Sequence, residues 1–328
     1  MNYIIFGGSG FIGTHLIHLL KETKPQANVY CLDIVLPGEE GVVPGIVEKN
    51  DGVVYERVDV RKKIEWDIQT TKDDVVFNLA AVHRTPGHKD IEYFETNIRG
   101  AENVTAWCEK KGIKHMLFTS SIAPYGAAEE LKTEDTLPTP NTPYGISKLV
   151  AEKLHEKWSV ANDAQLVIIR PGIVYGKGEH GNMTRLYAGI NKHYFFYTRK
   201  DTIKACIYVK ELVRFFIWAL ENGKNGVWNC TFEPAYNIEQ ICETMKKATG
   251  MEKNWIPSVN GKFLMGVAAV VGPIGGKVVG IHPARVKKLM ISTNINGQKL
   301  KDSGYEWKYT LEESFRDWFE DCDRKYLK

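Results

Sequence analysis

The sequence opens with Tyr3-Ile4-Ile5-Phe6-Gly7-Gly8-Ser9-Gly10-Phe11-Ile12-Gly13, an apolar run that leads directly into four glycines. The run is long enough for one buried strand, and the glycines satisfy both G-x-x-G-x-x-G and G-x-G-x-x-G. A turn of this kind leaves a strand sharply and lets backbone N–H groups approach a diphosphate at the start of the next helix, which requires small residues. The stretch therefore predicts a dinucleotide site, formed by Gly7, Gly10, Phe11, Ile12 and Gly13.

One acidic residue, Asp33, follows at the spacing that such a site requires. It lies 20 residues after Gly13, at the end of the second predicted strand. A carboxylate there can accept both ribose hydroxyls of the adenosine half, and it would repel a 2′-phosphate. No Arg or Lys follows at residues 34–36. The sequence favours NAD over NADP, with Asp59 and Val60, at the end of the third predicted strand, as further candidates for adenine contacts.

Short apolar runs alternate with longer helical patterns through the first half of the chain. The runs lack a strict period of two, as expected for strands buried on both faces of a parallel sheet. This alternation predicts a doubly wound α/β sheet of the Rossmann type. The predicted strands are Tyr3–Phe6, Val29–Leu32, Val53–Val58, Val75–Leu79, Met116–Thr119 and Leu166–Ile169, and the predicted helices are Phe11–Lys21, Glu92–Lys111 and Pro143–Val160.

The pattern becomes less regular after about Pro171, where Gly and Pro loops separate shorter elements. We expect residues 1–171 to form the NAD-binding Rossmann domain with the catalytic residues, and residues 172–328 to form mainly a smaller substrate-binding lobe. The helices predicted there are Asn182–Asn191, Lys210–Glu221, Asn237–Thr249 and Leu311–Lys325, the last with a capping box of Thr310 and Glu313.

The composition excludes several other classes of protein. Of 328 residues, 43% are hydrophobic and 25% charged, which is typical of a soluble globular protein. The net charge is only +3 and the Lys and Arg residues are interspersed with acidic ones, so no basic tract indicates binding to nucleic acid. The six cysteines form no C-x-x-C pair and have no nearby His at metal-ligand spacing, so we expect buried, reduced thiols and no metal site.

The first residues lack the pattern of a signal peptide, so we expect a cytoplasmic protein without a transmembrane segment. The apolar stretch Phe263–Ile281 contains Pro273, Lys277 and five glycines, which a spanning helix would have to accommodate. We interpret it as a buried helix followed by a loop, with contact to a membrane surface as the alternative.

A candidate catalytic group follows from Tyr144 and Lys148, four residues apart after Asn141-Thr142-Pro143. Residues at i and i+4 lie on one face of a helix. A phenol has an ordinary pKa near 10, and a neighbouring ammonium together with a positive nicotinamide favours its ionised form. Ser121, just after a predicted strand, can bind the same substrate oxygen. These residues therefore predict proton transfer opposite a hydride carrier.

With these residues in place, the chain resembles the extended short-chain dehydrogenase/reductases, the NAD-dependent epimerase/dehydratase group. The resemblance extends over nearly the whole chain, in family order and spacing. It is carried by Gly7–Gly13, Asp33, Asp59-Val60, Asn78-Leu79-Ala80-Ala81, Thr119-Ser120-Ser121, Tyr125-Gly126, Tyr144-Gly145-Ile146-Ser147-Lys148 and Arg170-Pro171-Gly172-Ile173-Val174-Tyr175-Gly176.

The resemblance implies roles for these residues. Tyr144 would be the acid/base, Lys148 would hold the nicotinamide ribose and Ser121 would orient the substrate. The remaining implied positions are Ala80 and Ala81 lining the cofactor, Asn97 supporting the core of the cofactor domain, and Pro171 beginning the segment beneath the nicotinamide.

Within the group, the chain is most similar to sugar-nucleotide 4-epimerases and 4-ketoreductases of surface-polysaccharide assembly. Lys204 and Arg285 take places where the family contacts a substrate diphosphate, so a nucleoside-diphosphate sugar is the expected substrate. The family also pairs helices equivalent to 92–111 and 143–160 across a two-fold axis, so we expect a homodimer. Those helices carry Val104, Trp107, Ile146, Leu154 and Trp158.

Several positions leave alternatives open. Serines 120 and 121 replace the acidic pair of the 4,6-dehydratases, so water elimination is not expected. His83 is interpreted as a loop residue and Arg84 as a possible anion contact, whereas the sequence does not explain the role of Lys210. A dehydrogenase of a small or steroid-like alcohol is the alternative function, and a non-catalytic NAD sensor is a third.

Overall fold

The computed structural model describes residues 1–39, 52–83, 87–259 and 291–328. Its centre is a seven-stranded sheet in the order β10-β7-β5-β4-β1-β2-β3, in which all neighbours run parallel. The predicted doubly wound α/β sheet is thereby confirmed. Its strands are β1 (Asn2–Phe6), β2 (Asn28–Asp33), β3 (Val53–Arg57), β4 (Val75–Asn78), β5 (His115–Thr119), β7 (Gln165–Pro171) and β10 (Gly226–Cys230).

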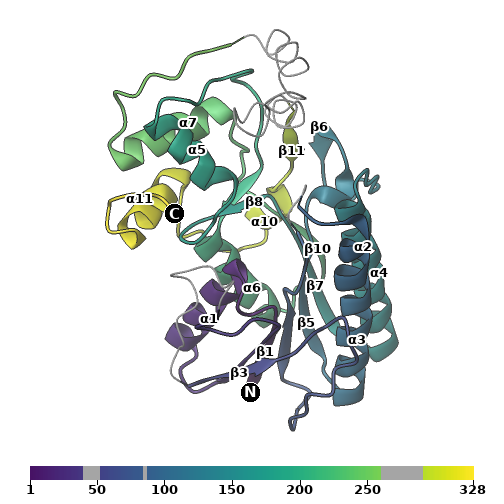
Figure 1. The fold of residues 1–328 in the computed structure, drawn as a ribbon. Coiled ribbons are helices and arrows are strands. Elements are labelled where there is room, and N and C mark those ends of the chain that lie inside the picture. The colour runs from purple at the N-terminus through teal and green to yellow at the C-terminus, as the bar shows by residue number, and fades with distance from the viewer. Residues whose placement is uncertain (40–51, 84–86, 260–290) are drawn as a thin grey trace.

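Helices cover both faces of this sheet (Figure 1). Helices α1 (Phe11–Thr23) and α6 (Val209–Glu221) lie on one face, where their apolar sides join a core with Phe77, Phe215 and Phe216. Helices α3 (Arg99–Lys111) and α4 (Pro143–Asn162) lie on the other face. Burial on both faces explains why the strands show no alternation of polar and apolar residues.

The single helix predicted over residues 92–111 is interrupted. The chain forms a short helix α2 (Asp90–Tyr93), then a π-helical turn η1 (Phe94–Ile98), and only then α3. A π-helical turn adds one residue to the helical repeat and changes which side chains face inward. The turn contains Asn97, which is buried.

The rest of the chain forms a smaller part beside the carboxyl edge of the sheet. It packs an aromatic cluster that includes the fully buried Phe315 and Trp318. The predicted capping box is confirmed, since Thr310 Oγ1 accepts from Glu313 N–H, although the helix ends at Asp321 rather than Lys325. The elements are α5 (Asn182–Asn191), α7 (Ile238–Thr249), α10 (Gln298–Lys301), α11 (Leu311–Asp321), η2 (Ala123–Tyr125), and the parallel pairs β8 (Ile173–Tyr175) with β9 (Cys206–Tyr208) and β6 (Ala128–Lys132) with β11 (Thr293–Ile295).

The sheet extends across residue 171, where we expected the two domains to divide. Strand β10 pairs with β7 and helix α6 covers the sheet, yet both follow β8 and β9 in the sequence. The domain boundary stays a prediction, but residues 209–230 belong to the sheet layer and not to the smaller part.

The sequence alone did not explain Lys210. In the structure this residue joins α6 to α11. Its ammonium lies 2.6 Å from an oxygen of Asp317 and 2.8 Å from one of Asp321. All three side chains are partly buried, and the Tyr208 hydroxyl donates to the same Asp317 oxygen. Lys210 therefore has a structural role at the junction of the two parts.

All six cysteines are buried and unpaired, as predicted. In the described ranges, no helix is both long and apolar enough to cross a membrane. The segment Phe263–Ile281 lies outside the described residues.

The turn after β1 generates a first prediction. Gly7 has φ +79°, and a Cβ on it would lie 2.6 Å from the amide nitrogen of Ala80, whereas Gly112 has φ +67° with open space around it. Gly112→Ala should cost about 1 kcal/mol from the backbone conformation alone, and Gly7→Ala should cost clearly more because β4 must also move. Thermal unfolding of both variants without NAD measures the difference, and equal losses would contradict the close packing of Gly7.

Candidate active site

The start of α4 determines where the predicted catalytic residues lie. Thr142 caps the helix by accepting a 3.1 Å hydrogen bond from Gly145 N–H, and Pro143 takes the first helical position. Gly145 is needed because a Cβ there would lie 2.7 Å from the carbonyl oxygen of Ala123. The helix therefore meets the segment that follows β5 almost backbone to backbone.

Ser121 and Tyr144 meet at this contact. Ser121 Oγ accepts from Ala123 N–H at 3.1 Å, and its hydroxyl lies close enough to the phenol of Tyr144 to influence the pKa of that phenol. Desolvation raises the pKa of Tyr144 above its ordinary value, and the Ser121 hydroxyl opposes that rise in part. Both residues remain partly exposed.

Lys148 lies one helical turn further, in a much drier place. It is 2% exposed, its ammonium donates to the carbonyl oxygen of Thr119 at 2.7 Å, and the same nitrogen lies 4.6 Å from the centre of the Phe118 ring. Burial lowers the pKa of Lys148 to about 7. A charged Lys148 close to Tyr144 would favour the phenolate, so its protonation state bears directly on proton transfer.

The glycine turn fits a dinucleotide. Helix α1 begins at Phe11 with Gly10 as a cap that provides no side-chain hydrogen bond, so the first N–H groups of the helix have no side-chain acceptor from the cap. A Cβ on Gly13 would lie 2.6 Å from the backbone of Gly8, which explains why the helix can pack so closely on the sheet. The positive end of α1 and the small residues around it would hold a diphosphate.

Asp33 lies beside this turn, at the end of β2. Its carboxylate accepts from Ser9 N–H at 3.0 Å and from Val35 N–H at 3.3 Å. Burial raises the pKa of Asp33, and the backbone N–H bonds act in the opposite direction. This is the position that a ribose-binding acid needs.

The third strand is shorter than predicted and ends at Arg57, so Asp59 and Val60 do not end it. The carboxylate of Asp59 is bound by the guanidinium of Arg61 through two 2.8 Å hydrogen bonds, and Val60 accepts from Asn103 through its carbonyl. A contact of these two residues with adenine stays a prediction.

The remaining predicted cofactor residues lie around the same edge of the sheet. Ala80 and Ala81 directly follow β4, and Ala80 packs on Gly7. The side chain of Asn97 accepts from Val82 N–H at 2.9 Å and donates to Ser147 Oγ at 2.9 Å, which joins η1, α4 and the segment after β4. Pro171 ends β7 and is buried.

Of the predicted substrate residues, only Lys204 is within the described part. It is 9% exposed, its ammonium donates to the carbonyl oxygen of Ile291 at 2.6 Å, and burial lowers its pKa to about 8. Its role toward a diphosphate stays a prediction. Arg84 and Arg285 lie outside the described residues, and His83 is exposed in the loop that precedes Arg84.

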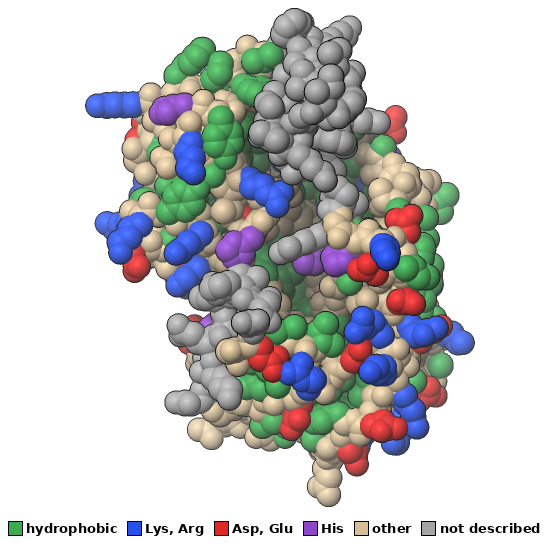
Figure 2. Space-filling view, in the orientation of Figure 1, with side chains coloured by type: hydrophobic (Ala, Val, Ile, Leu, Met, Phe, Trp, Pro, Cys, Tyr) green, Lys and Arg blue, Asp and Glu red, His purple; other side chains and the backbone are tan. Residues whose placement is uncertain are grey.

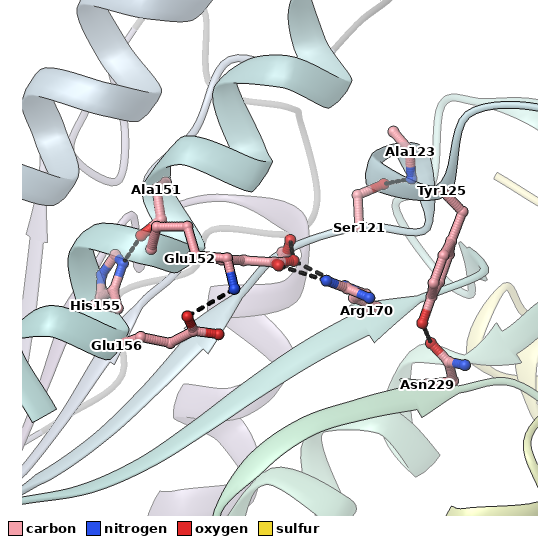
Figure 3. A network of polar contacts seen from close by, with 11 residues as sticks. Ser121, Ala123, Tyr125, Ala151, Glu152, His155, Glu156, Arg170 and Asn229 are labelled. Carbon is pink, nitrogen blue, oxygen red and sulfur yellow. Dashed lines mark hydrogen bonds and ion pairs between the residues drawn. The ribbon is translucent and has the colours of Figure 1, made fainter. Parts of the chain in front are cut away.

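Sequence reasoning missed a buried ion pair beneath this site. The guanidinium of Arg170 binds both carboxylate oxygens of Glu152, at 2.9 and 2.6 Å, and Ser120 Oγ donates to the same carboxylate at 2.5 Å (Figure 3). Arg170 also lies 4.6 Å from the centre of the Tyr125 ring, whose hydroxyl donates to Asn229 in β10. Removing one partner of such a pair costs about 3–5 kcal/mol. In the sequence, this pair was visible only as one acidic residue, Glu152, in a predicted helix and one basic residue, Arg170, directly after a predicted strand.

The site thus combines the predicted dinucleotide turn with the predicted acid/base Tyr144, at the edge where parallel sheets bind ligands. Figure 2 shows the molecule hollowed between the sheet and the smaller part. The family model of the NAD dependent epimerase/dehydratase family matches residues 3–232. The chain belongs to this family. Its cofactor is NAD, and the predicted NAD-dependent enzyme is confirmed at family level.

Individual relatives agree with this assignment. The chain is 29% identical over 320 residues, 94% of this chain and 92% of the relative, to N-acetyl-alpha-D-glucosaminyl-diphospho-ditrans,octacis-undecaprenol 4-epimerase of Escherichia coli O157:H7. It is 26% identical over 343 residues, 95% of this chain and 77% of the relative, to 3beta-hydroxysteroid-dehydrogenase/decarboxylase isoform 1 of Arabidopsis thaliana. The fold matches the crystal structure of UDP-glucose 4-epimerase with UDP-glucose from Thermotoga maritima with a TM-score of 0.74, at 21% identity over 99% of both chains.

The position of Tyr144 is consistent with its predicted role as the acid/base, which stays a prediction. In that role Tyr144 would take the proton of the substrate hydroxyl and Ser121 would hold that oxygen, while bound NAD would supply the hydride chemistry. We expect Tyr144→Phe to lower kcat at least about 100-fold, with NAD binding unchanged because the missing hydroxyl is needed for proton transfer. Steady-state kinetics and NAD titration measure this, and turnover near the wild-type rate would exclude Tyr144 as the acid/base.

Proposed function

We propose that this enzyme is an NAD-dependent 4-epimerase of a hexose carried on a diphosphate, in the synthesis of surface-polysaccharide precursors. The observation that carries the proposal is that the side chain beside the Tyr144 phenol, in a place where the dehydratases carry an acid, is the hydroxyl of Ser121. An elimination of water needs a further acid and base beside the tyrosine. Ser120, in the other place of the dehydratase pair, is buried and donates to Glu152, so it is directed away from Tyr144.

Epimerisation requires that one set of residues serves both directions of transfer. Tyr144 would take a proton from the C4 hydroxyl during oxidation, and would return it to the C4 oxygen after the keto sugar has turned over in the cleft. A 4-ketoreductase would use the same residues but would release the reduced sugar and exchange the cofactor after each turnover. The similarity to a 4-epimerase over nearly all of both chains supports the first alternative.

The diphosphate carrier has two chemical forms, a nucleoside and a polyprenol. The nucleoside-diphosphate sugar is the expectation from the sequence, and the lipid-linked sugar is supported by the relative from Escherichia coli. Both present the same hexosyl diphosphate to the cleft. A cytoplasmic location remains part of the proposal.

The alternative function, oxidation of a steroid-like alcohol, is supported by the similarity to the Arabidopsis protein over 95% of this chain. Such a substrate has no diphosphate. A non-catalytic NAD sensor is disfavoured because Tyr144, Lys148 and Ser121 are all present and contact one another or the same strand end.

The substrate assay separates these functions. NAD-loaded enzyme is incubated with UDP-glucose, UDP-N-acetylglucosamine, N-acetylglucosaminyl-diphospho-undecaprenol and a 3β-hydroxysteroid, with Tyr144→Phe as control. We expect the C4 epimer of at least one diphosphate-linked sugar, detected by proton NMR of the released sugar, without net formation of NADH. Stoichiometric consumption of NADH on a 4-keto sugar would indicate a ketoreductase, and oxidation of the steroid alone would overturn the proposal.

We further propose that the enzyme is a homodimer that pairs through α4. Val104, Trp107 and Trp158, which these helices carry, are buried in the chain's own core and are therefore not available for a dimer contact. The support lies in Ile146 and Val150, one turn apart on the outer side of α4 and 40% and 37% exposed.

Sedimentation over a range of concentrations tests the dimer. We expect Val150→Glu to shift the protein toward the monomer, since it would place charges in an apolar contact, and Leu137→Glu, at a 79% exposed position outside the helices, to leave it unchanged. A wild-type protein that stays monomeric at all concentrations would contradict the proposal.

A further inference from the structure

Three consecutive residues at the end of β5 face three residues of α4 that are spaced one helical turn apart. The Thr119 carbonyl accepts from Lys148, Ser120 Oγ donates to Glu152, and Ser121 lies beside the phenol of Tyr144. Two of these three pairs contain the predicted catalytic residues Lys148, Ser121 and Tyr144. The third pair, Ser120 with Glu152, has the same construction and no assigned role.

Glu152 is held by hydrogen bonds from the ends of two strands of the sheet. It is fully buried, and its two oxygens accept three hydrogen bonds, two from Arg170 in β7 and one from Ser120 (Figure 3). Strand β7 is the direct neighbour of β5, with Ile169 opposite Thr119. The carboxylate is therefore fixed by the ends of two adjacent strands, one helical turn from Lys148.

We propose that Glu152 is a positioning residue for catalysis: its charge keeps the buried Lys148 protonated, and Arg170 and Ser120 hold it where it can do so. It touches neither the substrate nor the cofactor in this role. Its effect reaches the reaction through Lys148, whose positive charge in turn favours the phenolate of Tyr144. The inference rests on the proposed roles of Tyr144 and Lys148 and deepens them.

The surroundings of Lys148 show why an anion is needed. Desolvation lowers the pKa of Lys148, and Glu152 is the charged side chain that opposes this. On β5, the Phe118 ring and the Thr119 carbonyl face the ammonium but carry no full charge.

The other titratable groups around Lys148 cannot replace Glu152. On α4, His155 stacks on Phe118 at 4.1 Å, and burial lowers its pKa to about 4, so it is neutral near pH 7. Tyr144 is the group to be ionised, and Tyr93 of α2, whose ring lies 6.0 Å from that of Tyr144, disfavours its ionisation. Arg170 is positive, so without Glu152 its charge would disfavour the protonated form of Lys148.

The sign of the effect separates this role from a purely structural one. Without Glu152, Lys148 loses its proton at lower pH, the phenol loses the positive charge one helical turn away, and Tyr144 should ionise at higher pH. A direct effect of the carboxylate on the phenol would have the opposite sign, because removing a negative charge makes ionisation easier. A structural ion pair alone would leave the ionisation of a correctly folded Tyr144 unchanged.

The experiment uses the double variant Glu152→Gln/Arg170→Gln as its main arm. Glu152→Gln alone would leave two buried cations without a partner, whereas the double variant removes one charge of each sign. Ser120→Ala removes one hydrogen bond and no charge, and Glu152→Asp retains the charge. Glu211→Gln is the matched control, because Glu211 is also fully buried and hydrogen-bonded, to Tyr305 and to backbone N–H groups distant from the site.

The readout is the ionisation of Tyr144 in NAD-loaded protein, taken as the ultraviolet phenolate signal of each variant minus that of the same variant carrying Tyr144→Phe. We expect the midpoint to rise by about one pH unit or more in the double variant, to rise less in Ser120→Ala, and to stay at the wild-type value in Glu152→Asp and Glu211→Gln. The low-pH limb of kcat should move in the same direction, with a smaller change in KM.

A midpoint that is unchanged or lowered in both the double variant and Ser120→Ala would overturn the proposal. Ser120→Ala decides the question if the double variant does not fold. The phenolate signal needs no substrate, so an error in the proposed substrate or reaction would leave this test intact.

Discussion

The close contact between the start of α4 and the end of β5 is the constraint on which the site depends. Without a side chain at Gly145, the helix approaches the Ala123 carbonyl, and this close approach brings the phenol of Tyr144 beside Ser121. Everything that follows along α4 is then determined by the helical repeat. Lys148 lies one turn beyond Tyr144 and reaches the last carbonyl of β5. Glu152 lies one turn beyond Lys148 and reaches Ser120, the residue after that carbonyl. The fold thereby converts a spacing in the sequence into a row of three polar contacts.

Much of this could be predicted from the sequence, for a physical reason. The glycine turn, Asp33, Tyr144 and Lys148 depend on local geometry, such as a sharp turn, a strand end or one helical turn, and such geometry leaves a pattern in nearby residues. Pairings between distant segments leave none. Glu152 and Arg170 are 18 residues apart in different elements, and Lys210 finds its acidic partners more than a hundred residues away in α11. Strand β10 was missed because a five-residue edge strand bounded by Gly226 resembles a loop.

The interrupted helix illustrates a different limit. The hydrophobic pattern of residues 92–111 continues through the break, so periodicity alone predicts one helix. The sequence pattern does not reveal the π-helical turn. In the structure its consequence is that Asn97 faces inward and is hydrogen-bonded to both Val82 and Ser147. An added residue in a helix costs hydrogen-bond quality and is retained where a side chain must be aimed. Here the side chain joins the segment after β4 to the helix that carries the acid/base.

The order of the sheet has a consequence for how the protein can be divided. The chain leaves the sheet at Pro171, forms β8 and β9 in the smaller part, and returns through α6 to complete the sheet with β10. Neither part is a continuous stretch of sequence. A cut at any single peptide bond near residue 171 would leave the first fragment without an edge strand and without half of the cover on one face. The two parts therefore cannot be separated by a single cut, and an end-to-end fusion of the smaller part to a complete seven-stranded sheet would not produce this order of elements.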